Sequence, residues 1–329
     1  MADQSAMNAD DSEADDFELR RYILMLGPMV EPLIFNSAPL RRTYDHLRLV
    51  IYLKVPGCWV AAPHGRGKTV AIEYCARRLM AEVPGLPVFI VNEQILPGNE
   101  LRSFFIRALT ESGYSKPYAK DSTNLRQRLP MYWAELSKNS PLQCVVLFLD
   151  EGQSMRPLDE GLLKDLSNQI ARFGGSLLTI TFGESPAFDA LISRRKSSTN
   201  MDGAVDRLFG GSRLDLSCYQ DESDWKSLFA EMDSTNFEEL GGCTVPQAYF
   251  SHMNMQNFTL QNEAKRFCKA LRKVYGASAF KDVNLRRVFV GIRHALMTTA
   301  LSSINNHLST IDSISEKAWM DALKFSIQK

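Results

Sequence analysis

The sequence predicts an α/β fold, in which a parallel β-sheet lies between helices, followed by a helical domain. Short apolar runs of four to six residues alternate with segments of helical periodicity, at 58–62, 88–91, 144–149 and 177–182. Strands separated by crossovers long enough for a helix form a parallel sheet that is covered on both faces. From residue 221 onward almost every segment has helical periodicity.

The composition is that of a globular chain with room for a large core. The chain has 329 residues, of which 45% are hydrophobic and 23% are charged. These values exclude a fibrous or mostly disordered protein. No stretch approaches the roughly 18 uncharged apolar residues of a membrane span, and the acidic start lacks the basic and apolar regions of a signal peptide. We therefore expect a cytoplasmic protein with no membrane partner.

The formal net charge of zero is a difference between two unlike regions. Residues 1–16 contain six acids and no Lys or Arg, which leaves residues 17–329 with 38 bases against 32 acids, a formal charge of +6. Zero net charge by itself would argue against a nucleic-acid partner, whereas a mildly basic body permits one.

The cysteines predict reduced, mostly buried thiols. No two of them form a CxxC pair, and the five histidines lie at no metal-ligand spacing relative to them, so neither a zinc site nor a disulfide framework is indicated. The six are Cys58, Cys75, Cys144, Cys218, Cys243 and Cys268.

Four regions follow in order along the chain. Residues 1–16 are too poor in apolar side chains to offset the entropy of ordering, so we expect a disordered acidic tail. Residues 17–55 are expected to form a mainly helical adaptor. The apolar run at its end, residues 47–53, could also form a short strand. Residues 56–220 form the α/β core, with a last strand near 212–216, and residues 221–329 form the helical domain. In that domain Ser313 and Glu316 match a capping box ahead of the last helix.

A phosphate-binding loop follows the first predicted strand and precedes a helix. The pattern is GxxxxGK[ST] with Ala62 in place of the first glycine, in the strand-loop-helix context that the motif requires. Glycines let backbone N–H groups turn toward phosphate oxygens, and the helix N-terminus favours negative charge. A chance match in a turn is the simpler alternative, which this context disfavours. The predicted ATP-binding residues are Ala62, Pro63, His64, Gly65, Arg66, Gly67, Lys68 and Thr69.

Two carboxylates, Asp150 and Glu151, end the third predicted strand. In isolation they would be read as a solvated strand end. Together with the phosphate loop, they predict a catalytic site. Asp150 and the Thr69 hydroxyl are the expected Mg²⁺ ligands, and Glu151 is the expected base that polarises the attacking water.

The fourth predicted strand carries Thr181 near the carboxyl edge of the sheet, where ligands of open α/β sheets bind. Thr181 is either a sensor of the γ-phosphate or simply a good strand former. Both interpretations stay open.

The order of these motifs resembles that of the AAA+ ATPases over roughly residues 40 to 300, which implies a P-loop NTPase core and a helical lid. More narrowly, the chain is similar to the TniB/TnsC transposition regulators, including those of CRISPR-associated transposons. The narrower resemblance depends on overall size and on two short segments, Gly183-Glu184-Ser185-Pro186 and Asp206-Arg207-Leu208-Phe209.

The resemblance implies roles for further residues. Arg207 matches the arginine finger that reaches a neighbouring subunit's site, and Arg286 or Arg287 matches the second sensor of the lid, with Arg286 slightly preferred. The segment 93–132 matches the region that faces DNA in this family, so Arg102, Lys120 and Thr123 are expected to contact the DNA backbone. A surface arginine and a solvated charged face are the plain alternatives for Arg207 and for this segment.

The expected function is that of a Mg²⁺- and ATP-dependent, DNA-binding regulator of transposition. The resemblance implies a ring or filament on duplex DNA, with roughly six or seven subunits per turn, that links a target selector to a transposase. The alternatives are a helicase loader or replication initiator and, from another class, a signalling NTPase switch. An appended winged-helix DNA-binding domain would favour an initiator, and the residues beyond the second-sensor helix leave little room for one.

Overall fold

The computed structural model describes residues 18–19, 21–23, 33–92, 100–114, 122–155, 157–197, 208–210, 213–276 and 278–328. The chain divides into two compact units. One comprises Leu40–Ser217, and the other combines Met1–Pro39 with Cys218–Lys329. The predicted adaptor, residues 17–55, is thus shared between the units, and the predicted tail lies outside the described residues.

The first unit contains a five-stranded parallel sheet, which confirms the predicted α/β class. The strand order is β2-β3-β4-β1-β5, so β4 lies between β1 and β3. The carboxyl end of β4 therefore lies between the ends of β1 and β3, each of which is followed by a predicted motif. The strands are β1 (Gly57–Ala62), β2 (Val88–Asn92), β3 (Val145–Asp150), β4 (Leu177–Glu184) and β5 (Arg213–Asp215).

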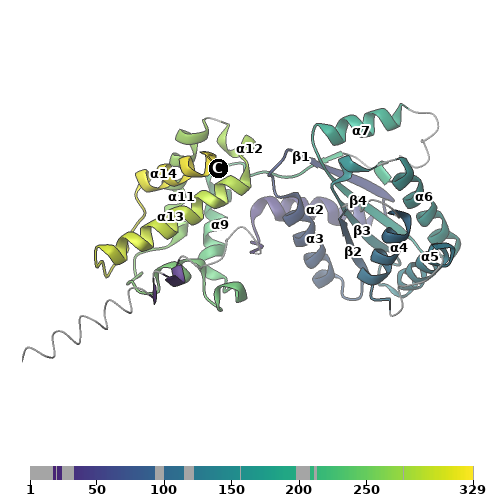
Figure 1. Ribbon diagram of the computed structural model, residues 1–329, viewed down its shortest axis with the longest axis horizontal. Coiled ribbons are helices and arrows are strands. Elements are labelled where there is room, and N and C mark those ends of the chain that lie inside the picture. Colours follow the sequence, from purple (N-terminus) through teal and green to yellow (C-terminus); the bar gives the residue numbers. More distant parts are fainter. Residues whose placement is uncertain are drawn as a thin grey trace, which may run out of the picture. The chain divides into compact units, whose positions relative to one another are not determined.

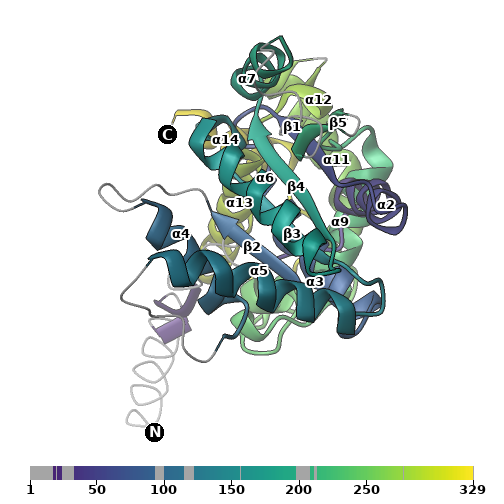
Figure 2. The same cartoon turned by 90° about the vertical axis from the view of Figure 1, so that its right-hand side faces the viewer.

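Helices cover both faces of this sheet (Figure 1). α2 and α3 lie on one face, and α4, α5 and α6 lie on the other. Trp133 of α5 belongs to the same buried hydrophobic cluster as Leu147 and Leu149 of β3. Figure 2 shows β2, β3 and β4 side by side, with α7 beyond the end of β4. The helices are α2 (Ala38–Tyr52), α3 (Lys68–Glu82), α4 (Glu100–Glu111), α5 (Ser122–Asn139), α6 (Pro157–Arg172) and α7 (Ala187–Lys196), with a 3-10 turn η1 (Gly152–Ser154).

α2 settles the alternative that the sequence left open, because the apolar run that could have been a strand is helical as far as Tyr52. Its position against α3 is fixed by hydrogen bonds. The hydroxyls of Tyr44 and Tyr52 both donate to the Glu82 carboxylate, at 2.6 Å each. These two bonds lower the pKa of Glu82, so the carboxylate that joins the helices is ionised at neutral pH.

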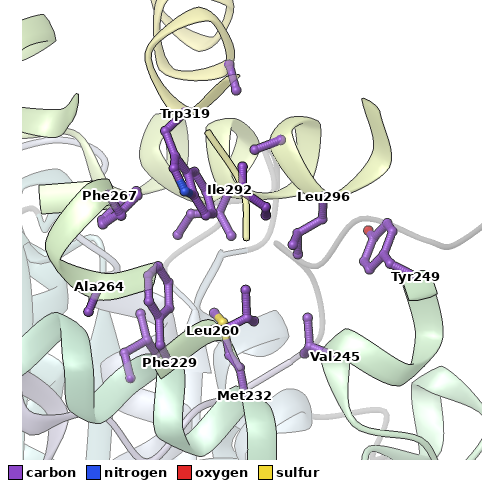
Figure 3. Packing of buried hydrophobic residues seen from close by; sticks show 14 of the residues in the cluster. Phe229, Met232, Val245, Tyr249, Leu260, Ala264, Phe267, Ile292, Leu296 and Trp319 are labelled. Carbon is purple, nitrogen blue, oxygen red and sulfur yellow. The ribbon is translucent and has the colours of Figure 1, made fainter. Parts of the chain in front are cut away.

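The second unit is helical, as predicted. Its core is rich in aromatic residues: Phe229 of α9, Phe267 of α11 and Trp319 of α14 converge in Figure 3. Each of the three side chains is fully buried. Burial of a large apolar side chain contributes roughly 1.5–3 kcal/mol to the free energy of folding. The elements are α9 (Glu222–Ser234), η2 (Glu238–Leu240), α10 (Val245–Phe250), α11 (Leu260–Tyr275), α12 (Ala279–Asp282), α13 (Leu285–Asn305) and α14 (Glu316–Gln328).

The start of α14 differs from the predicted capping box. Ser315, rather than Ser313, accepts the backbone N–H of Ala318 at 3.1 Å. Glu316 instead binds two lysines of α11, Lys269 at 2.7 Å and Lys273 at 2.6 Å. A tertiary contact thus uses the carboxylate that the sequence pattern assigned to a local cap.

The cysteines are free thiols, and four of them are buried. Burial raises the pKa of Cys58, Cys75 and Cys268 to about 12 and that of Cys144 to about 11. A thiol with such a pKa is protonated and unreactive at neutral pH. Among the described helices, none is long and apolar enough to cross a membrane.

Candidate nucleotide-binding site

The predicted phosphate loop joins the end of β1 to the start of α3. Gly65 has φ +73° and Gly67 has φ +80°, a region that residues with a Cβ adopt only with strain. α3 begins at Lys68, so its first N–H groups lie next to the loop. The Lys68 side chain is largely buried, and its Nζ lies 3.5 Å from the carbonyl oxygen of Pro63. The loop therefore has the turn, the cation and the helix N-terminus that anion binding requires.

The two residues assigned to the metal are in direct contact. Thr69 Oγ1 donates to Asp150 Oδ2 at 2.7 Å, although the residues lie 81 positions apart. Asp150 is 3% exposed, and its second oxygen accepts the backbone N–H of Glu151 at 2.8 Å. A hydroxyl and a carboxylate oxygen side by side form the kind of oxygen site that Mg²⁺ takes beside nucleotide phosphates. The residues present thus fit the cation, which would supply neutralisation of phosphate charge.

The predicted base, Glu151, follows Asp150 in a left-handed conformation with φ +58°. Its side chain is exposed, and its Oε2 accepts a hydrogen bond of 2.5 Å from Nε2 of Gln153. This left-handed residue follows the last residue of β3 and turns the chain into η1. The turn carries the Glu151 carboxylate beyond the edge of the sheet.

Glu184, at the end of β4, is a site residue that sequence reasoning did not assign. Its Oε2 lies 3.2 Å from Nδ1 of His64 and 4.0 Å from Nζ of Lys68. Its backbone N–H donates to Oε1 of Gln153 at 2.7 Å. Glu184 pairs in register with Ala62, which explains why it reaches the loop. In the sequence, Glu184 belongs to the segment 183–186, which indicates a family but not the contact with the loop.

Thr181 is not brought together with the other predicted site residues. It pairs with Leu149 and Trp59, and residues paired in a parallel sheet point to one face while the next residue points to the other. Asp150 therefore points to the face opposite Thr181. Thr181 is 0% exposed, and its hydroxyl has no hydrogen-bond partner within the part of the chain that the structure describes.

The segment after Glu184 is anchored to the sheet by Asp189 of α7. Asp189 accepts hydrogen bonds from Nε of Arg213 at 2.8 Å and from the hydroxyl of Ser185 at 2.5 Å. Partial burial acts to raise the pKa of Asp189, but these donors outweigh it and leave the pKa lowered. Arg213 in turn lies over the Trp59 ring, at 5.7 Å from its centroid. This network fixes β4 and α7 relative to β5.

The remaining predicted residues lie elsewhere or outside the described part. Arg207 and Lys120 lie outside the described residues. Arg102 lies in α4 and Thr123 in α5, but the structure describes neither side chain. Arg286 and Arg287 are exposed in the first turn of α13, in the helical unit, where Asn284 caps the helix by accepting the Arg287 N–H at 3.2 Å.

No protein-family model matches this sequence, and no curated protein matches it. Similarity appears in comparison with solved structures. The ORC2 protein of Aeropyrum pernix, solved as ADPNP-ADP complexes, is 16% identical with a TM-score of 0.61, over 91% of this chain and 71% of that one.

Two further structures are similar. Cdc6p from Pyrobaculum aerophilum is 13% identical with a TM-score of 0.54, over 87% of this chain and 67% of that one. A chain of Drosophila ORC bound to DNA is 15% identical with a TM-score of 0.51, over 94% of this chain and 66% of that one. Together with the parallel sheet and the helical C-terminal part, these similarities show that the chain has the fold of the ORC/Cdc6-type AAA+ ATPases.

Proposed function

We propose that this protein is a Mg²⁺-dependent ATPase that acts on duplex DNA. The observation that carries the ATPase proposal is the 2.7 Å contact between Thr69 and Asp150 beside the buried Lys68. A chance GKT sequence in a turn would not bring a threonine hydroxyl against the carboxylate that ends another strand.

Each side chain then has a role in hydrolysis. Lys68 binds the β- and γ-phosphates, Thr69 and Asp150 hold the metal, and Glu151 accepts the proton of the attacking water. Because phosphoryl transfer needs little covalent chemistry from the protein, positioning and charge stabilisation account for most of the rate.

A DNA-directed role in replication initiation or helicase loading is the better supported of the two AAA+ interpretations. The similar structures are ORC and Cdc6 proteins, one of them a DNA complex. Regulation of transposition, with a transposase and a target selector as partners, is supported only by the short segments 183–186 and 206–209. A signalling switch has no specific observation in its favour.

Assembly and DNA contact are part of the same proposal. Arg207 would complete a neighbouring subunit's site, and Arg286 or Arg287 would couple the helical unit to the nucleotide. ATP bound between subunits would link nucleotide binding to oligomerisation. Arg102, Lys120 and Thr123 would contact the DNA backbone with little sequence preference, as side chains that pair with phosphates do.

The ATPase proposal is tested with two variants of the full chain. Lys68→Ala should lose ATP binding, measured with a fluorescent ATP analogue, while Lys226→Ala, an exposed lysine of α9, should retain it. Glu151→Gln should bind ATP and release phosphate at least about 100-fold more slowly than the parent, and Glu111→Gln of α4 should not. Unchanged ATP affinity in Lys68→Ala, or parental turnover in Glu151→Gln, would contradict the assignment.

Assembly is tested separately, by light scattering with ATP and duplex DNA. The proposal expects a mass several times that of one chain, which Arg207→Ala should prevent. A mass of one chain under all conditions would overturn the assembly proposal and leave the ATPase proposal standing.

A further inference from the structure

We propose that Gln153 is a positioning residue for the base Glu151, and that it joins this base to the strand end that carries Glu184. The inference depends on the hydrolytic role proposed above for Glu151. It concerns a residue that the sequence pattern did not single out.

Gln153 contacts both residues through opposite ends of one amide group. Its Nε2 donates to Oε2 of Glu151 at 2.5 Å, and its Oε1 accepts the backbone N–H of Glu184 at 2.7 Å. A backbone N–H can only donate, so the amide oxygen must face Glu184. The NH₂ group must therefore face Glu151, and the orientation of the amide is fixed by chemistry.

The Glu151 carboxylate depends on this donor for its orientation. Glu151 is exposed at a left-handed turn, and within the described part of the chain no other side chain donates a hydrogen bond to its carboxylate. An exposed glutamate with no partner would sample several rotamers. A base that must polarise one water molecule needs a single orientation.

The turn that carries Gln153 is itself held firmly. η1 is closed by hydrogen bonds from Ser154 N to Glu151 O at 2.8 Å and from Met155 N to Gly152 O at 3.2 Å. Gly152 packs so closely that a Cβ there would lie 2.5 Å from Cγ2 of Thr181. Gln153 thus lies in a turn that is packed against the buried residues Thr181 and Phe188.

The other end of the link lies beside the phosphate loop. The Glu184 carboxylate is within 4.0 Å of Lys68 Nζ and 3.2 Å of His64 Nδ1. A phosphate bound by Lys68 would meet this carboxylate, and a shift of Glu184 would reach Gln153 through the backbone N–H. The structure therefore connects the site of phosphate binding to the orientation of the base by two hydrogen bonds.

The test compares Gln153→Ala, Gln153→Glu and the control Ser154→Ala, an exposed residue of the same turn. Gln153→Ala should lower kcat about 10- to 100-fold and leave the Kd for ATP within about twofold, because the loss falls on orientation rather than on binding. Gln153→Glu retains an oxygen for the Glu184 N–H but sets a second carboxylate against Glu151. The glutamate offers no N–H to the Glu151 carboxylate, so kcat should fall as in Gln153→Ala while the Kd for ATP again stays within about twofold.

The outcomes separate the two proposals. Parental kcat in both Gln153 variants would overturn the positioning role, as would a faster Gln153→Ala enzyme or a loss that falls on the Kd for ATP instead of kcat. If Gln153→Ala fails to fold, Gln153→Glu decides the matter by the same comparison of kcat with Kd, since it keeps the size of the side chain and the oxygen that accepts the Glu184 N–H. A parent chain that does not hydrolyse ATP, or an active Glu151→Gln variant, would instead contradict the proposed function.

Discussion

At the scale of single residues, the edge of the sheet is shaped by two glycines that pack against one buried ring. A Cβ on Gly183 would overlap Cδ1 and Cγ of Phe188, and a Cβ on Gly152 would lie 2.7 Å from Cζ of the same ring. Phe188 is 0% exposed and cannot swing out. The two glycines therefore allow the turn after β3 and the end of β4 to approach the core closely, next to the candidate site.

Gly183→Ala should lower the free energy of unfolding by about 1–3 kcal/mol, since overpacking a filled core displaces buried neighbours. Gly161→Ala is the matched control, because this α6 glycine has nothing within 4 Å of an added Cβ. The control should be neutral or slightly stabilising, as alanine is the better helix former. Urea denaturation of both variants measures the difference, and equal stability of the two would contradict this packing argument.

Adding Phe188→Leu should reduce the loss of stability caused by Gly183→Ala, because the effects of neighbouring substitutions are not additive.

The same residues show what the sequence could and could not predict about the site. Lys68 and Thr69 are predicted because they end the phosphate-loop pattern after the first strand, and Asp150 because it ends the third strand. Glu184 and Gln153 were missed because their contacts depend on the register of β4 against β1, which pairs Glu184 with Ala62. Thr181 is predicted as a sensor from its position near the strand end. Its pairing with Leu149 places its side chain on the face of the sheet opposite Asp150. Alternation along a strand is readable from sequence, whereas register between strands is not.

At the scale of elements, α11 is held in the helical unit by a buried carboxylate. Glu263 is 1% exposed, and it accepts hydrogen bonds from Trp319 Nε1 of α14 at 3.2 Å and from Arg266 at 2.6 Å. Asp233 of α9 caps the same helix by accepting the backbone N–H groups of Leu260 and Gln261. The amphipathic pattern predicts α11 itself, but not the polar contacts that fix it to its neighbours.

Glu263→Gln should change how stability depends on pH. Burial raises the pKa of Glu263 above its ordinary value of 4.5, although its hydrogen-bond donors partly oppose this. For a carboxyl with a raised pKa in the folded state, the stabilising contribution is complete below the unfolded pKa and is lost as pH rises through the folded value. The parent should therefore lose stability relative to Glu263→Gln as pH rises above about 4.5, as urea unfolding at several pH values would show.

Glu316→Gln supplies the control of opposite sign. Hydrogen bonds from Lys269 and Lys273 lower the pKa of Glu316, so its contribution is present above the unfolded pKa and is lost as pH falls through the folded value. The two variants should deviate from the parent in opposite directions with pH. A constant difference between Glu263→Gln and the parent across the range would show that Glu263 keeps its ordinary pKa.

At the scale of the whole molecule, the sequence predicts a change to helical periodicity at residue 221, and the two compact units divide between Ser217 and Cys218. The grouping of residues up to Pro39 with the helical unit was not predictable in the same way. Phe35 stacks on Phe289 and packs edge-on against Phe237, and nothing local marks these partners, which lie some 200 residues along the chain or farther. Contacts between distant segments depend on the assembled fold.

The charge distribution leads to a prediction about DNA binding that involves the whole chain. Residues 1–16 hold six acids, and the rest of the chain has a formal charge of +6. Phosphate contacts depend on net positive potential and weaken steeply with salt. If the protein binds duplex DNA as proposed, the acidic residues oppose that binding, and deleting residues 1–16 should tighten it roughly 3- to 10-fold at low salt.

Charge, rather than the length of the segment, should be responsible for this effect. Replacing the six acids by Asn and Gln in the full-length chain should therefore reproduce the deletion. The gain should shrink as the Debye length falls from about 10 Å at 0.1 M salt to about 3 Å at 1 M. Fluorescence anisotropy with a labelled duplex, titrated at several salt concentrations with ATP present, measures all three proteins. Equal affinity of the parent and the neutralised chain at low salt would show that residues 1–16 do not oppose DNA binding.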